Sequence, residues 1–172
     1  MNEPSAAFLA DARRGSPSAL TTLFQRYGST VFRVAYRITA STDEADDVVQ
    51  DVFVGLPEAL RHYRGAGSLE AWIHRIATRT ALMRLRRTRR EVGDSELTDR
   101  LVDTLSAIAA RLTLEAALRR LPESLRLVFV LKELEGYSHA EIALLLNIRV
   151  GTSEVRLHRA MKRLREALET SR

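Results

Sequence analysis

A helix predicted to begin near Thr152 carries side chains that can contact DNA. At about 100° per residue, Val155, His158, Arg159 and Lys162 point to one side of this helix. The opposite, mostly apolar arc consists of Ser153, Leu157, Ala160, Met161, Leu164 and Leu168. Arginine and lysine hold phosphates, arginine also pairs with the edge of guanine, and valine contacts the methyl group of thymine. A buried face backed by an exposed basic face is what a helix in the DNA major groove needs.

A short helix is predicted directly before it. Ser138 and Glu141 have the spacing of a capping box, in which each side chain satisfies a free backbone N–H of the first turn. Residues 147–151 supply the turn, and Thr152 is in position to cap the next helix. Two helices joined in this way form a helix-turn-helix motif. The alternative is a helical hairpin with a solvated charged face, and the motif alone leaves both interpretations open.

The most basic part of the chain is residues 61–90, with nine Lys and Arg residues against one acid. Gly65-Ala66-Gly67 breaks the chain, and Ser68 is predicted to cap a helix that runs to about Arg90. Its predicted inner stripe is Leu69, Trp72, Ile73, Ile76, Thr80 and Met83. The residues predicted to share another face are Arg75, Arg79, Leu82 and Arg86, and those that enrich the helix end are Arg84, Arg87, Arg89 and Arg90. This basic rod beside a glycine-containing loop predicts a second contact with nucleic acid.

An acidic helix is predicted to begin after Ser41. Ser41 and Glu44 have the spacing of another capping box, and acids in this first turn suit the positive end of the helix dipole. Asp47, Gln50 and Asp51 form an exposed patch beyond that turn. Residues 55–57, Gly-Leu-Pro, are expected to kink or restart the helix because proline lacks the N–H and clashes with the preceding turn.

Helical periodicity also covers most of the remaining chain, and no strand signal of useful length occurs. The periodicity fails after residue 91, where residues 91–110 carry five acids against one arginine. The predicted fold is therefore all-α, with two small helical domains joined by a flexible acidic linker. The domains are predicted at residues 1–90 and 109–172, and the linker at residues 91–108.

The composition of the 172-residue chain excludes several classes of site. Its net charge of +5 favours a polyanionic partner, and the absence of cysteine excludes disulfides, thiolate zinc sites and cysteine nucleophiles. The four histidines lie in separate segments without metal spacing, and no phosphate-binding loop or nucleophile elbow occurs. We therefore expect no enzymatic activity, cofactor or metal site. No run approaches the roughly 20 apolar residues of a membrane span, so a soluble, cytoplasmic protein without membrane insertion is expected.

Several motifs occur together in the order of one known family. In the first half they are DEADDVVQDVF at residues 43–53 and GSLEAWIHRIA at residues 67–77. In the second half they are LPE at 121–123, GYSHAEIA at 136–143, VGT at 150–152 and RLHRA at 156–160. On these motifs the chain resembles bacterial sigma factors of the sigma-70 class. It is similar in particular to the compact extracytoplasmic-function (ECF) group, which retains only the second and fourth conserved regions.

The resemblance implies a transcription initiation factor that directs the RNA polymerase core to promoters and opens them, without a cofactor or catalysis of its own. Asp47, Gln50 and Asp51 would dock on the clamp of the largest polymerase subunit. The flap of the second-largest subunit, promoter DNA and an anti-sigma factor are the other implied partners. The acidic linker would thread near the active site and imitate nucleic acid, and an ordinary solvated tether is the alternative.

The resemblance also assigns the two basic surfaces to the two promoter elements. The residues implied at the minus-10 element are Gly65, Ala66, Gly67, Ser68, Arg75, Arg79 and Arg86. There the loop would capture an extruded base and the arginines would hold phosphates. The residues implied at the minus-35 element are Arg149, Thr152, Glu154, Val155, Arg156, His158, Arg159 and Lys162.

The chain departs from the family pattern at positions that affect promoter choice. Arg79 and Met83 replace an Asn and an Asp that are common in the basic helix, and residues 55–57 stand where an aromatic residue is frequent. Ser153-Glu154-Val155 stands where Val-Lys-Ser is usual, so a promoter sequence cannot be carried over. A different hypothesis is a stand-alone helix-turn-helix regulator in which residues 1–90 serve dimerisation. It predicts that the isolated protein binds duplex DNA.

Overall fold

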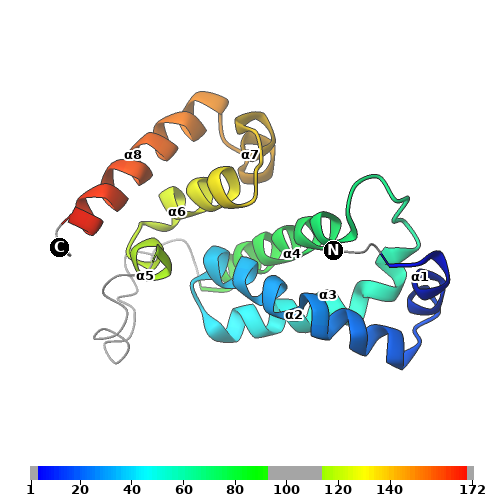
Figure 1. Ribbon diagram of the computed structural model, residues 1–172. Helices are drawn as coiled ribbons and strands as arrows, with labels where there is room; N and C mark the ends of the chain where they lie inside the picture. The colour runs from blue at the N-terminus through cyan, green and yellow to red at the C-terminus, as the bar shows by residue number, and fades with distance from the viewer. Residues whose placement is uncertain (1–3, 93–113, 170–172) are drawn as a thin grey trace. The chain divides into compact units, whose positions relative to one another are not determined.

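The computed structural model describes residues 4–92 and 114–169, and over these ranges the chain is helical without a strand (Figure 1). This confirms the predicted all-α class. The chain divides into two compact units, Met1–Asp94 and Ser95–Arg172. The predicted linker lies outside the described residues from residue 93 onward.

The first unit is a bundle of four helices. They are α1 (Ala6–Arg13), α2 (Pro17–Thr39), α3 (Thr42–Leu60) and α4 (Leu69–Val92). In Figure 1, α2, α3 and α4 lie alongside one another, and α1 packs against α2 and α3. The core between them contains fully buried aliphatic side chains, among them Leu23, Val31, Ile38, Val48, Leu56 and Ile73. Removing this much apolar surface from water is the main term that stabilises the unit.

Helix α3 runs without interruption through Gly55 and Pro57, so the predicted restart is wrong. Leu56 and Leu60 are both fully buried, and their packing holds this end of α3 in helical conformation. Pro57 lies in the last turn, where the missing N–H costs one hydrogen bond of the helix. At the other end of α3, Ser41 Oγ accepts from the backbone N–H of Glu44 at 3.4 Å.

The register of α4 matches the prediction at Leu69 and Ile73 but shifts by about one position further along the helix. Met83 was expected in the inner stripe, but 68% of it is exposed, whereas Leu82 was expected among the arginines and is buried. Helix α4 packs against both α2 and α3, so its buried arc is wider than an arc that faces one neighbour. The buried positions include Leu69, Ile73, Ala77, Thr78, Ala81 and Leu82.

The second unit consists of shorter helices packed on one long helix. They are α5 (Leu114–Arg119), α6 (Glu123–Phe129), a π-helical continuation η2 (Val130–Leu134), α7 (His139–Leu146) and α8 (Val150–Glu169). Helices α5, α6 and α7 each pack against α8. The core includes Leu118, Val128, Leu131, Ile142 and Ala160. None of the described helices in either unit combines the length and apolar composition that a membrane crossing requires.

Candidate nucleic-acid and protein interfaces

Helices α7 and α8 form the predicted helix-turn-helix. The capping box is confirmed: Glu141 N donates to Ser138 Oγ at 3.2 Å, and Ser138 N donates to Glu141 Oε2 at 2.8 Å. Asn147 ends α7 in the left-handed conformation with φ of 52°, which asparagine tolerates better than most residues. Each end of this short helix is thus fixed by its own sequence.

Helix α8 begins at Val150, earlier than predicted, so the assignment of Thr152 as its cap is wrong. The left-handed Asn147 reverses the chain at once, and the turn needs only residues 147–149. The first helical bond on this side joins Ser153 N to Arg149 O at 3.1 Å. Thr152 therefore lies within the first turn, half-buried, instead of preceding it.

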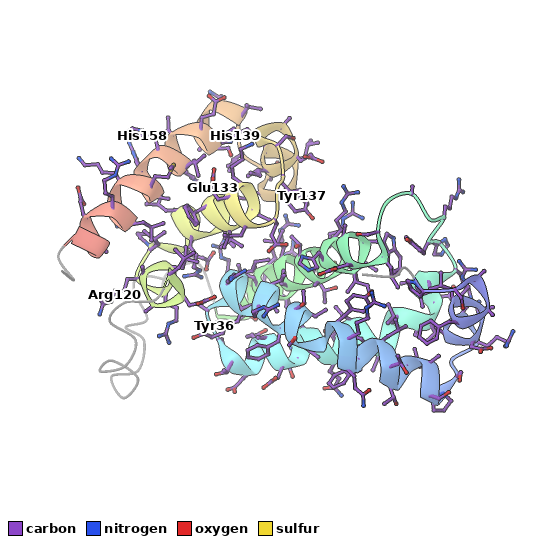
Figure 2. All side chains as sticks on the ribbon, in the orientation of Figure 1. Tyr36, Arg120, Glu133, Tyr137, His139 and His158 are labelled. Carbon is purple, nitrogen blue, oxygen red and sulfur yellow. The ribbon has the colours of Figure 1, made fainter. Side chains whose placement is uncertain are left out.

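A buried polar contact locks α8 onto α7. Ser153 is fully buried, and its Oγ lies 2.9 Å from His139 Nδ1. Figure 2 labels His139 on α7 and His158 on α8. Periodicity predicted that Ser153 faces inward, which is confirmed, but nothing in the local pattern pointed to His139 as its partner. A buried hydroxyl needs such a partner because an unpaired one costs free energy.

The other side of α8 is exposed to solvent. Six of the eight residues expected at the minus-35 element are exposed, and Thr152 and Arg156 are half-buried. The exposed residues are Arg149, Glu154, Val155, His158, Arg159 and Lys162. Met161 was predicted in the buried arc but is 44% exposed, and the side chain of Leu168 lies outside the described residues.

Arg159 and Lys162 lie at one edge of this exposed face. They line a shallow groove together with Arg163, Glu166 and the start of α6, where Pro122, Ser124 and Leu125 complete it. Val155 is half exposed and lies nearer the middle of the face. Sequence analysis missed Arg163, which is exposed beside Arg159 and one turn of helix away from it. The spacing of four residues from Arg159 places Arg163 on the same face of the helix and could have identified it.

In the first unit, Arg75, Arg79 and Arg86 project from α4 into solvent. The four residues of the preceding loop, Gly65 to Ser68, are exposed as well. Gly65 and Gly67 have φ of 76° and 83°, which side chains other than glycine rarely adopt. Ser68 caps α4, since its Oγ accepts from Ala71 N at 3.1 Å. The exposed Met83 lies on the same face as the three arginines.

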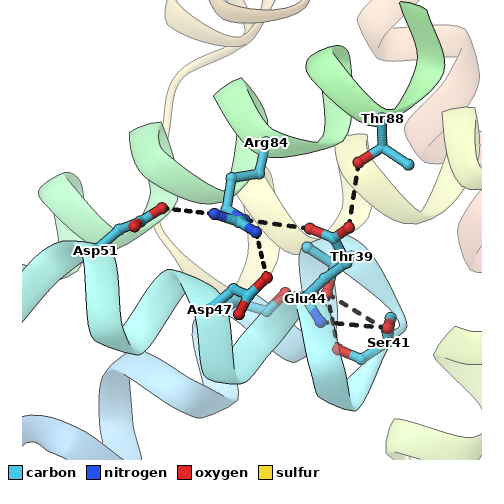
Figure 3. A network of polar contacts seen from close by, with 8 residues as sticks. Thr39, Ser41, Glu44, Asp47, Asp51, Arg84 and Thr88 are labelled. Carbon is cyan, nitrogen blue, oxygen red and sulfur yellow. Dashed lines mark hydrogen bonds and ion pairs between the residues drawn. The ribbon is translucent and has the colours of Figure 1, made fainter. Parts of the chain in front are cut away.

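The acidic patch on α3 is bound to α4 through one arginine (Figure 3). Arg84 donates from Nε to Glu44 Oε2 at 3.2 Å, from one terminal nitrogen to Asp51 Oδ2 at 2.7 Å, and from the other to Asp47 Oδ2. Glu44 also accepts from the hydroxyl of Thr88 at 3.2 Å. Because the Glu44 carboxylate turns to α4, the reciprocal half of the capping box predicted with Ser41 does not form.

This network changes the predicted role of Arg84. It was expected to extend the exposed basic rod, and instead all three of its nitrogen positions meet carboxylates of α3. Partial burial alone would lower the pKa of the Arg84 guanidinium, but hydrogen bonds to Asp51 and Glu44 and the charge of Asp47 raise this pKa overall. Asp47 and Asp51 keep 53% and 50% of their side chains exposed, and Gln50 is exposed between them. The predicted patch is thus accessible but already paired within the chain.

Comparison with known proteins identifies both units. Residues 23–91 match the Sigma-70 region 2 family, and residues 111–164 match the family described as Sigma-70, region 4. The chain is 30% identical to the ECF RNA polymerase sigma factor SigE of Mycolicibacterium smegmatis over 97% of this chain and 69% of that protein. It is 31% identical to the RNA polymerase sigma-H factor of Pseudomonas aeruginosa over 91% of this chain and 90% of that protein. The chain belongs to the sigma-70 family.

Two solved structures have the same fold. The sigma factor RpoE of Bartonella quintana, in complex with the anti-sigma factor NepR, aligns with a TM-score of 0.59 over 88% of this chain and 98% of RpoE, at 22% identity. CnrH in complex with the cytosolic domain of CnrY aligns with a TM-score of 0.53 over 95% of this chain and 96% of CnrH, at 28% identity.

As an ECF sigma factor, the protein is a transcription initiation factor that directs RNA polymerase to promoters. The region 2 match covers residues 23–90 of the segment that the stand-alone regulator hypothesis assigned to dimerisation. That hypothesis is therefore not supported. Helix α1 lies outside the matched ranges.

Proposed function

We propose that this sigma factor divides promoter initiation among three exposed surfaces. The acidic patch on α3 docks on the clamp of the largest polymerase subunit, through Asp47, Gln50 and Asp51. The loop of residues 65–68 and the arginine face of α4 engage the minus-10 element, and the exposed face of α8 reads the minus-35 element. The observation that carries this proposal is that residues of all three surfaces are exposed while the opposite faces of the same helices form the cores.

At the minus-10 element, the chemistry required is strand opening. Extruding a base from the duplex costs a few kcal/mol, so a site that receives the extruded base favours the open state and selects its sequence. A glycine loop suits this role because the DNA strand can approach its backbone closely. Arg75, Arg79 and Arg86 then hold phosphates, which positions the strand without specifying its sequence.

At the minus-35 element, α8 reads base edges in the major groove. Val155 contacts a thymine methyl group, and Arg159 pairs with a guanine edge. Glu154 accepts from the amino group of a cytosine or repels sites that lack one. Arg149, Thr152, Arg156, His158 and Lys162 bind backbone phosphates. The negative charge of Glu154 makes this face less basic than a non-specific DNA-binding helix.

The two units support each other because they belong to one chain. We assign residues 1–90 to the minus-10 domain and residues 109–172 to the minus-35 domain, with a linker at residues 91–108. Once one domain is bound, the second contact is intramolecular and needs only modest affinity of its own. The flap of the second-largest polymerase subunit is the proposed support for the second domain.

We also propose where this sigma factor acts and what controls it. The polymerase core supplies all the chemistry, and the sigma factor itself has no catalytic activity and acts in the cytoplasm. RpoE and CnrH were both solved with proteins bound to them, NepR being an anti-sigma factor. We expect an anti-sigma factor to control this chain as well.

Run-off transcription from a promoter library tests the proposed function. Purified bacterial core polymerase is assayed with and without the full-length protein, and complex formation with the core is measured separately by size-exclusion chromatography. We expect a subset of promoters to fire only when the protein is present. Absence of both transcription and a complex with the core would contradict the proposal, and binding of duplex DNA by the isolated protein would favour the stand-alone regulator.

A further inference from the structure

Residues 65–68, the glycine-containing part of the loop between α3 and α4, need a restraint from a residue outside this segment. Gly65 and Gly67 both adopt positive φ, and residues 64–68 are exposed. Glycine loses more conformational entropy on ordering than any other residue, so such a loop by itself populates many conformations. A loop that selects one base must present one shape.

Tyr63 ties the beginning of this loop to its end. Its hydroxyl donates to the carbonyl oxygen of Gly67 at 2.8 Å, and only 7% of the residue is exposed. Its ring packs on Trp72 in the first turns of α4, with ring centroids 5.1 Å apart and planes at 49°. The hydrogen bond closes the segment from residue 63 to residue 67, and the ring contact joins that closed segment to α4.

Arg13 of α1 holds the other side of this arrangement. Its Nε donates to Leu60 O at 3.0 Å, and a terminal nitrogen donates to Tyr63 O at 3.1 Å. Leu60 is the last residue of α3, where carbonyls lack partners within the helix and a cation is favourable. One side chain therefore fixes both the end of α3 and the backbone of Tyr63.

We propose that Tyr63, braced by Arg13, is a positioning residue that sets how strictly the loop of residues 65–68 selects its base in the minus-10 element. This inference rests on the proposed role of that loop. It gives α1, which precedes the region matched to the family, a part in promoter selection. Tyr63 itself touches no DNA in this scheme and acts through the carbonyl and backbone of Gly67.

The test is the variant Tyr63→Phe, which removes the hydroxyl and keeps the ring. Holoenzyme reconstituted with the full-length variant is assayed on promoters carrying each single-base substitution in the minus-10 element. We expect the ratio between the best and second-best base to fall about three- to tenfold, the worth of one hydrogen bond. Complex formation with the polymerase core should stay close to the wild type, and the thermal unfolding midpoint should fall by no more than a few degrees.

Two outcomes would overturn the inference. If Tyr63→Phe lowers transcription from every promoter by the same factor, the hydroxyl has only a structural role. If it changes nothing, the loop keeps its shape without the bond. If the wild-type protein activates no promoter, the proposed function itself is wrong. Failure of the proposed function is therefore distinguishable from failure of the role inferred for Tyr63.

Adjacent arginines on α1 provide a matched pair for the second half of the proposal. Arg13→Ala should reduce base selection in the same direction as Tyr63→Phe. Arg14→Ala is the control, because Arg14, directly after α1, pairs with Asp11 of that helix and 73% of its side chain is exposed. If both arginine variants reduce base selection equally, Arg13 does not support Tyr63 in this role. The role of Tyr63 is then decided by the Tyr63→Phe variant alone.

Discussion

Helices α4 and α8 are both long and rich in arginine, yet the two units use their arginines differently. On α4, Arg84 faces α3 and is surrounded by three carboxylates, while Arg75, Arg79 and Arg86 face solvent. On α8, Arg159 and Lys162 are exposed along a shallow groove. Charge counted along a sequence therefore does not separate arginines that pair with carboxylates of the fold from those exposed on the surface; the neighbouring helix makes that distinction.

The largest expected effect concerns base selection by α8. Arg159→Ala should reduce discrimination at one minus-35 position by about 5- to 150-fold, since a bidentate contact to guanine contributes roughly 1–3 kcal/mol. Run-off transcription on single-base variants of the minus-35 element measures it, with Arg165→Ala, an exposed arginine of α8 that does not line the groove, as the control. If Arg159→Ala lowers transcription by the same factor on all sequences, Arg159 contacts a phosphate. The exposed basic residues of α8 would then act as those of α4 do, and the two helices would not differ in this respect.

The next effect concerns the stability of the first unit. Arg84→Ala should lower its free energy of unfolding by about 0.5–2 kcal/mol, because ion pairs this exposed contribute only about 0.2–1 kcal/mol each. Urea denaturation at low and high salt measures the loss, which should shrink as salt screens the charges. Arg61→Ala is the control: Arg61, directly after α3, pairs with Glu58 of that helix at 3.0 Å, and both side chains are mostly exposed. A similar loss of unfolding free energy in both variants would mean that the link between α3 and α4 adds nothing to stability.

The smallest effect concerns the phosphate contacts of α4. Arg86→Ala should weaken all promoters by a similar, several-fold factor and reduce the slope of log affinity against log salt by about 0.7–0.9, the share of one phosphate. Promoter binding by the holoenzyme, titrated at several salt concentrations, measures both quantities. A change in base preference without a change in slope would place Arg86 at a base edge.

Several local signals in the sequence predicted local structure correctly. The capping box at Ser138, the inward-facing Ser153 and the exposed Val155 followed from spacing alone, because each depends on residues within a few turns of the same helix. The all-α fold followed from the same periodicity. These features needed no knowledge of what packs against them.

Other features depend on residues far apart in the chain and could not be predicted. Arg84 and Glu44 are separated by 40 positions, and only the packing of α4 on α3 brings them together. The register of α4 was misjudged because a helix covered by two neighbours buries more than one stripe, as Leu82 illustrates. Tyr63 was missed altogether, since its partner Gly67 is defined by the path of a loop.

The buried contact between Ser153 and His139 also bears on how this factor could be given new promoters. Ser153 belongs to the first turn of α8, but its side chain is committed to α7 and is fully buried. Residues 154 and 155 follow it directly and are exposed. A library that randomises Glu154, Val155 and Arg159 while keeping Ser153 and His139 should yield folded variants with altered specificity. Such variants would serve as orthogonal regulators, each firing its own promoters beside the parent.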